Sequence, residues 1–181
     1  MSSNIRLLSI VAGIMLGLSS ACFIVSNAVP EWGKYKITGI ESTIGLWQYC
    51  AFVSNVKTCQ SISSELESFD ADTYHKIQAA EAFVTLACIM SGISTCCLLA
   101  CALMGDNVHQ ILLWTSKGLA FSSFIMGTVG IALGIYAIFN NRLTNQLFTQ
   151  LTITLGAASC IGIAAIVINL VGAIIAVFMR K

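Results

Sequence analysis

The sequence predicts an α-helical membrane protein: a left-handed bundle of four transmembrane helices with one modest domain outside the bilayer. Of the 181 residues, 57% are hydrophobic and only 9% are charged, and the formal net charge is +1. A soluble domain carries about 25% charged residues. The composition therefore excludes a soluble globular domain, a disordered chain and a polybasic nucleic-acid binder.

Four apolar stretches are long enough to cross the bilayer, which takes about 20 residues. They cover residues 7–29, 79–104, 118–139 and 151–179. Each must be a helix, because lipid offers no partners for free backbone groups. The fourth stretch is long, so we expect it to tilt or to extend beyond the hydrocarbon. The whole chain, residues 1–181, is expected to form a single domain.

The basic residues predict the orientation of the chain. With four spans, both termini and the loop 105–117 share one side, which carries Arg6, Lys117, Arg180 and Lys181. The loops 30–78 and 140–150 share the other side, where basic residues are sparser along the chain. The positive-inside rule therefore predicts cytosolic termini, a cytosolic loop 105–117 and two extracellular loops.

Small residues recur at every fourth position within the spans, as at Gly13 and Gly17 or Gly130 and Gly134. Such ladders let helix backbones approach closely in lipid. We expect them to pack one bundle from within, and a self-association face on one helix is the alternative. Asn169 lies deep inside the last span and is expected to bond to a neighbouring helix.

The first extracellular loop is typical of short strands. Residues 34–38 alternate, with Tyr35 and Ile37 on one side and two lysines on the other. Residues 45–53 and 56–62 are rich in aromatic and β-branched residues, which indicates two further strands. A tight turn at Ser54 and Asn55 would join them into a hairpin.

This hairpin predicts one disulfide. If the turn is its centre, Val53 faces Val56 and Cys50 faces Cys59. Facing residues have Cα atoms about 4.5–5.5 Å apart, within the range of a disulfide. The oxidising compartment outside the cell would preserve the bond. A pair of free thiols or half a metal site is the alternative, although no histidine lies beside them.

The six remaining cysteines lie in the spans, where most are expected to be small packing residues. Cys97 and Cys101 approach the cytosolic end of the second span. They are our candidates for palmitoylation.

A short motif in the first loop resembles the claudin superfamily. Trp32 is followed by Gly45, Leu46 and Trp47, and then by Cys50 and Cys59. This order resembles the claudin pattern W, G-L-W-x-x-C and C. The stretch 77–83 is similar to a claudin motif before the second span, and the topology agrees. The abrupt basic end of the chain is closer to the peripheral myelin and epithelial membrane protein branch.

The resemblance implies a bundle capped by a small antiparallel sheet, with the Cys50–Cys59 bridge joining two strands. Trp32 and Trp47 would anchor that sheet at the membrane surface, where indole rings are favoured. The resemblance further implies a protein of cell–cell junctions, a tight-junction or paracellular barrier component in the plasma membrane. Its expected partners are lipid and itself, laterally as a homo-oligomer and across the cell gap. No PDZ scaffold is expected, because the sequence ends shortly after the last span.

Claudin pores select ions by charges on the sheet near the disulfide, and Lys57 is the nearest charge here. Glu65 and Glu67 belong to an acidic cluster ahead of the second span. These three residues are candidate selectivity charges, and the cluster suggests a cation-favouring vestibule. A solvated loop face is the alternative.

Enzymatic activity is not expected, because no catalytic or nucleotide-binding motif appears. No cofactor or metal is implied by the sequence. The alternative functions are an auxiliary subunit that modulates an ion channel or receptor, and a myelin-type membrane organiser. Co-purification of a channel in equal amount would favour the auxiliary subunit.

Overall fold

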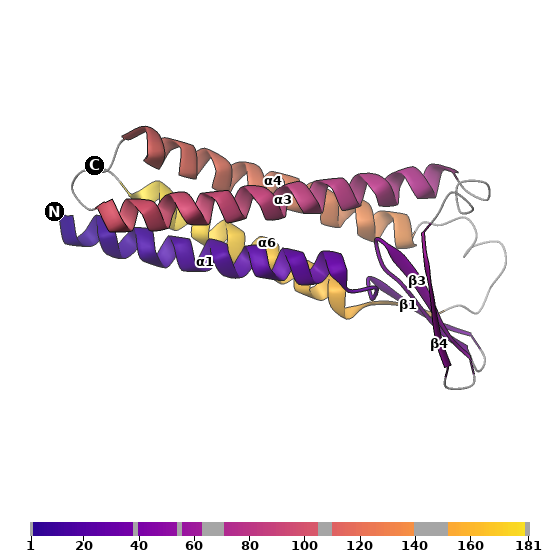
Figure 1. Ribbon diagram of the computed structural model, residues 1–181. Helices are drawn as coiled ribbons and strands as arrows, with labels where there is room; N and C mark the ends of the chain where they lie inside the picture. Colours follow the sequence, from indigo (N-terminus) through magenta and orange to yellow (C-terminus); the bar gives the residue numbers. More distant parts are fainter. Residues whose placement is uncertain are drawn as a thin grey trace. The chain divides into compact units, whose positions relative to one another are not determined.

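The computed structural model describes residues 2–37, 40–53, 56–62, 71–104, 110–139 and 152–179 (Figure 1). Its long helices are α1 (Ser2–Ala28), α3 (Ala71–Met104), α4 (Gln110–Phe139) and α6 (Ala157–Phe178). All 4 are long and apolar enough to cross a membrane, judged by length and composition. The chain is therefore a membrane protein in its helical part.

All four helices begin at residues other than those predicted for the spans. Helix α1 begins at Ser2, α3 at Ala71 and α4 at Gln110, each ahead of its predicted span. Residues 110–117 are thus helical and do not belong to a loop. The expected span over 151–179 is wrong at its start, since β5 (Thr152–Leu155) is a strand and α6 begins at Ala157.

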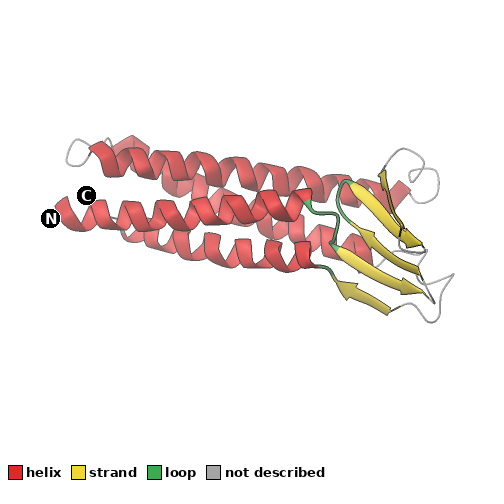
Figure 2. Ribbon diagram, turned by 60° about the horizontal axis from the view of Figure 1, so that its bottom comes forward, coloured by secondary structure: helices red, strands yellow, loops and turns green. Residues whose placement is uncertain are grey.

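The strands form one antiparallel sheet of five members (Figure 2). Besides β5, they are β1 (Gly33–Ile37), β2 (Ile40–Ile44), β3 (Gln48–Val53) and β4 (Val56–Ser61). The order across the sheet is β4-β3-β2-β1-β5. The predicted antiparallel sheet is confirmed, and β2 and β5 are additions to it.

The predicted register of the hairpin is confirmed. In β3 and β4, Val53 pairs with Val56 and Cys50 pairs with Cys59. The two cysteines form a disulfide, with Cα atoms 4.1 Å apart. The predicted turn at residues 54–55 lies outside the described residues.

The chain divides into two compact units. The helical unit comprises Met1–Ile24, Thr85–Thr128 and Ile163–Lys181, and the sheet unit comprises Val25–Val84 and Val129–Gly162. Each unit is described by itself.

Glycines bring the helices of the helical unit together. A Cβ at Gly172 of α6 would lie 3.0 Å from Cγ of Leu16 in α1. A Cβ at Gly127 of α4 would lie 2.6 Å from Cζ of Phe23 in α1. The contacts are too close for larger residues, so these glycines pack helices of the same chain, as predicted.

Polar side chains of the helical unit bond from one helix to the next. The Ser19 hydroxyl of α1 donates to the carbonyl of Ala165 in α6, at 2.9 Å. Asn169 Nδ2 of α6 donates to Ser123 Oγ of α4, which donates to the Ala87 carbonyl of α3. The predicted bond of Asn169 to a neighbouring helix is confirmed.

Candidate functional site

The register of the sheet separates its side chains into two faces, because facing residues point to the same side. One row of paired residues crosses four strands and consists of Lys36, Glu41, Phe52 and Lys57. The next row on the same face contains Thr154, Lys34, Thr43, Cys50 and Cys59. These two rows define the charged face of the sheet.

The opposite face lies against α4. Tyr35 of β1 donates its hydroxyl to the Ile138 carbonyl at 3.4 Å. A Cβ at Gly33 would lie 2.7 Å from Cγ2 of Ile138, so glycine allows this close approach. Burial, together with the nearby Tyr49, raises the pKa of Tyr35 to about 12. The phenol is therefore uncharged throughout the physiological pH range.

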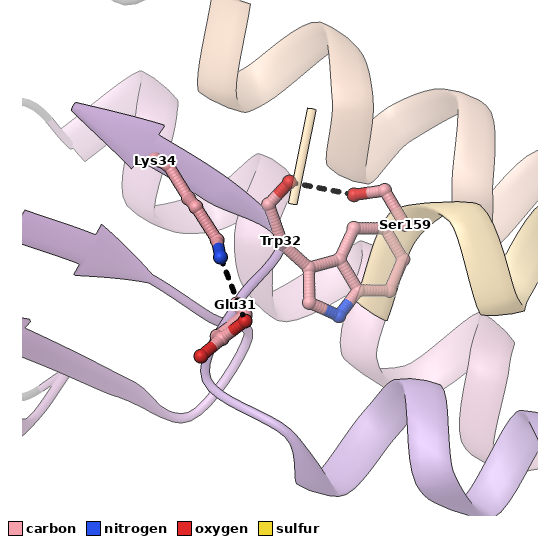
Figure 3. A network of polar contacts seen from close by, with 4 residues as sticks. All are labelled: Glu31, Trp32, Lys34 and Ser159. Carbon is pink, nitrogen blue, oxygen red and sulfur yellow. Dashed lines mark hydrogen bonds and ion pairs between the residues drawn. The ribbon is translucent and has the colours of Figure 1, made fainter. Parts of the chain in front are cut away.

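Trp32 ties the sheet to the helices of its own unit (Figure 3). Its indole nitrogen donates to the Ser26 carbonyl near the end of α1, at 2.7 Å. Its carbonyl accepts hydrogen bonds from the Ser159 hydroxyl at 2.7 Å and from the Gly156 amide at 2.9 Å. A Cβ at Gly134 of α4 would lie 2.6 Å from its ring. One residue thus contacts α1, α4 and the start of α6.

Trp32 does not contact lipid or water as an interfacial tryptophan would, because its side chain is 0% exposed. Trp47 is 48% exposed, and its indole nitrogen donates to Asn27 Oδ1 at 2.9 Å. Of the two tryptophans predicted to anchor the sheet at the membrane surface, only Trp47 is half-exposed. The anchoring by Trp32 comes from burial and hydrogen bonds.

The Gly45-Leu46-Trp47 segment forms the tight connection between β2 and β3. The Gly45 amide donates to the Gln48 carbonyl at 2.8 Å. A Cβ at Gly45 would lie 2.5 Å from the Cα of Pro30, so a larger residue would displace backbone. Leu46 is buried beneath this turn. The motif therefore has a structural explanation in packing, independent of any family.

The charged face carries two ion pairs. Lys36 Nζ lies 2.8 Å from Glu41 Oε1, and Lys34 Nζ lies 3.2 Å from Glu31 Oε2. The Lys36 ammonium holds the pKa of Glu41 below its usual value, and the carboxylate raises the pKa of Lys36. Figure 3 shows the Lys34–Glu31 pair pointing away from the Trp32 indole. Lys36 and Glu41 are five positions apart in the sequence, so only the β1–β2 pairing reveals this contact.

Lys57, a candidate selectivity charge, lies at the end of the charged row. Its ammonium lies 5.3 Å from the centroid of the Phe52 ring, in a cation–π contact. Every residue of β4 is exposed, and this strand forms one edge of the described sheet. The sheet therefore presents a charged face and, at β4, an edge that pairs with no further strand among the described residues.

The other predicted site residues lie elsewhere. Glu65, Glu67 and the loop 140–150 are outside the described residues. Cys101 is buried in an apolar cluster of the helical unit with Leu98 and Leu113, whereas Cys97 is partly exposed. Palmitoylation stays a prediction, and its chemistry is better suited to Cys97.

Within the described ranges, no group of three or more histidine, cysteine, aspartate or glutamate residues could hold a metal ion. Neither a scan against protein-family models nor a search of curated proteins found a match to this chain. Its claudin resemblance therefore rests on the motif residues and topology alone.

Proposed function

We propose that this chain is a claudin-like protein of cell–cell contacts. It associates side by side in the plasma membrane and adheres, or forms a paracellular barrier or ion pathway, through its sheet. One observation carries this proposal: a disulfide-bonded sheet is fixed to apolar helices on one face and exposes charges on the other. A sheet held in this way suits recognition outside a membrane.

The proposal includes an orientation. The helices form a left-handed bundle across the plasma membrane, and both termini lie in the cytosol. The basic residues near the termini and at Lys117 support this orientation through the positive-inside rule. The sheet and its disulfide then lie outside the cell, where a disulfide persists.

The β4 edge suits binding to another chain, and the charged face suits an effect on the passage of ions. The unpaired backbone groups of an edge strand can bond to a strand of another chain. Lys34, Lys36 and Lys57 outnumber Glu31 and Glu41 by one charge on and beside the charged face. The described part of the sheet thus has no excess of acid that would favour cations, and a cation-favouring role would depend on Glu65 and Glu67.

The proposal is tested in cultured cells that lack junctions. The tagged protein is expressed in some of the cells, and boundaries between two expressing cells are compared with boundaries between an expressing and a bare cell. Enrichment only at the first kind of boundary is expected, because adhesion requires a sheet on each side. Uniform staining at both kinds would contradict the adhesive role.

An auxiliary subunit of an ion channel or receptor is the second candidate. The exposed β4 edge favours it, since that edge can equally accept a strand from a different protein. The glycine ladders give it no support where they contact helices of the same chain. Purification from native membranes with one channel or receptor in equal amount would favour this candidate over the first.

A further inference from the structure

A cavity of about 470 Å³ lies on the charged face of the sheet. Its volume falls within the range of about 300–1,000 Å³ that is usual for small-molecule sites. Its lining includes the four charged residues of the two ion pairs, an aromatic ring and a hydroxyl: Glu31, Lys34, Lys36, Glu41, Phe52 and Thr154. All of them belong to the sheet unit.

The charges around the cavity are balanced and can be displaced. The two ammonium groups are matched by the two carboxylates, in the pairs Lys34–Glu31 and Lys36–Glu41. Both pairs are partly exposed to solvent. Exposed ion pairs contribute little to stability, because water and salt screen them. A ligand can therefore exchange these contacts for its own at small cost.

The interior of the cavity adds hydrogen-bonding capacity. Thr43 and Thr154 flank Lys34 on the neighbouring strands, and both line the cavity. Thr43 is only 6% exposed and its Oγ1 is buried from solvent, whereas Thr154 is exposed. The Thr154 hydroxyl is therefore the one that a ligand in the cavity can reach. Phe52 supplies an apolar wall.

We infer that this cavity binds a small zwitterion, a molecule with one ammonium group and one carboxylate or phosphate group. Lys34 and Lys36 lie two residues apart on one face of β1, which separates their Cα atoms by about 6.5–7 Å. The ligand's anionic group lies between their ammonium groups, and its cationic group is paired with Glu31 or with Glu41. A ligand of a single charge would satisfy one set of residues and repel the other.

Two sources can supply such a ligand. One is a free amino acid, and the other is the headgroup of a zwitterionic phospholipid. Glu31 follows the end of α1, and its carbonyl accepts the Ala158 amide at the start of α6. In the membrane orientation proposed above, the cavity thus lies where α1 ends and α6 begins, near lipid headgroups as well as solvent.

The test uses the full-length protein in maltoside micelles, whose headgroups are uncharged. Binding of β-alanine and of phosphocholine is measured by saturation-transfer NMR, with acetate and ethylammonium as single-charge controls of similar size. Both zwitterions are expected to bind about tenfold more tightly than either control, because only they pair with the lysines and with a glutamate at the same time. Equal signals from all four compounds, or none from the zwitterions, would overturn the inference.

Variants locate the site. Lys36→Glu is expected to weaken zwitterion binding about tenfold and to favour ethylammonium, because it leaves one ammonium among three carboxylates. Gln60→Glu, an exposed residue of β4 that does not line the cavity, is the matched control and is expected to bind normally. Unchanged zwitterion binding in Lys36→Glu would overturn the assignment.

A bilayer comparison separates the two sources. The β-alanine measurement is repeated in phosphatidylcholine and in phosphatidylglycerol nanodiscs. Suppression by phosphatidylcholine alone would identify a lipid headgroup as the occupant, and equal binding in both would identify a soluble zwitterion. Either result supports a zwitterion site, whereas loss of binding only in phosphatidylglycerol would indicate an anion site and overturn it.

Discussion

The helical unit and the sheet unit satisfy their polar groups in different ways. In the helical unit, backbone groups bond within each helix, and hydroxyls such as Ser19 and Ser123 donate to carbonyls of neighbouring helices. Its outward side chains are apolar, as at Ile14 and Val167. In the sheet unit, strands pair with one another, a disulfide joins two of them, and the outward groups include ion pairs.

This difference supports the proposed division of roles between the two units. An apolar surface with internally satisfied polar groups suits lipid and offers little chemistry for recognition. An exposed sheet with charges and a free edge suits contacts in water. We therefore assign anchoring to the helical unit and recognition to the sheet unit, and the following predictions would sharpen or break this division.

The largest effect is expected from Trp32→Ala. It removes a fully buried indole and its hydrogen bond to Ser26, at a cost of about 3–5 kcal/mol. Trp47→Ala is the matched control and should cost about 1 kcal/mol, because this ring is half-exposed. The cost of each substitution is measured by the hydrogen exchange of the strand amides in the purified protein. Equal costs would mean that Trp32 does not hold the sheet to the helices.

Loss of the disulfide is expected to be the next largest effect. The double variant Cys50→Ser, Cys59→Ser should destabilise the β3–β4 hairpin by about 2–4 kcal/mol, because its unfolded chain is no longer constrained. Faster amide exchange should be confined to these strands. Cys160→Ser, at an exposed free cysteine of α6, is the control. Equal exchange in both variants would contradict the prediction.

Alkaline pH should destabilise the sheet unit through Tyr35. Its pKa is about 12 in the folded protein, against 10.0 ordinarily, so the folded state keeps a proton that the unfolded state loses. Stability is therefore expected to fall as the pH rises from 10 to about 12, by about 2 kcal/mol. Tyr35→Phe should abolish this fall in stability. It should also remove one step near pH 12 from the absorbance titration of the tyrosine side chains. A variant that titrates like the wild type would contradict it.

The smallest effect is expected in the helical unit, from Asn169→Leu. The change removes one hydrogen bond to Ser123, but it also removes Oδ1, a buried atom without a partner in the described part of the chain. The net cost should be about 0.5 kcal/mol. Ser123→Ala should cost more, about 1–3 kcal/mol, because it leaves the Asn169 amide unpaired. Unfolding by dodecyl sulfate in mixed micelles measures the stability lost in each variant. A larger loss in Asn169→Leu than in Ser123→Ala would refute this explanation.

The sequence is most informative where local pattern and burial agree. Taking Ser54 and Asn55 as the centre of the hairpin predicts both the register of Cys50 and Cys59 and their disulfide, and the apolar runs identify all four helices. The start of α6 was missed because residues 152–155 carry no charge and run without interruption into the apolar helix that follows. The β-branched residues Thr152 and Thr154, followed by Gly156, were the signal that could have revealed β5.

The features that the sequence did not predict depend on contacts between residues far apart in the chain. Strand β2 is short and polar, and β1 and β3 stabilise it from either side. The burial of Trp32 depends on Gly134, which is distant in the sequence. The grouping of Lys36 with Glu41 and Phe52 likewise requires the register of three strands.

The most direct test of the division between the units is the clustering of vesicles that contain the purified protein. We predict that vesicles cluster when both populations carry the protein, that Lys57→Glu on the charged face weakens clustering, and that Asn169→Leu leaves it unchanged. Clustering that is insensitive to Lys57→Glu but lost in Asn169→Leu would contradict the account, because recognition would then depend on the helical unit.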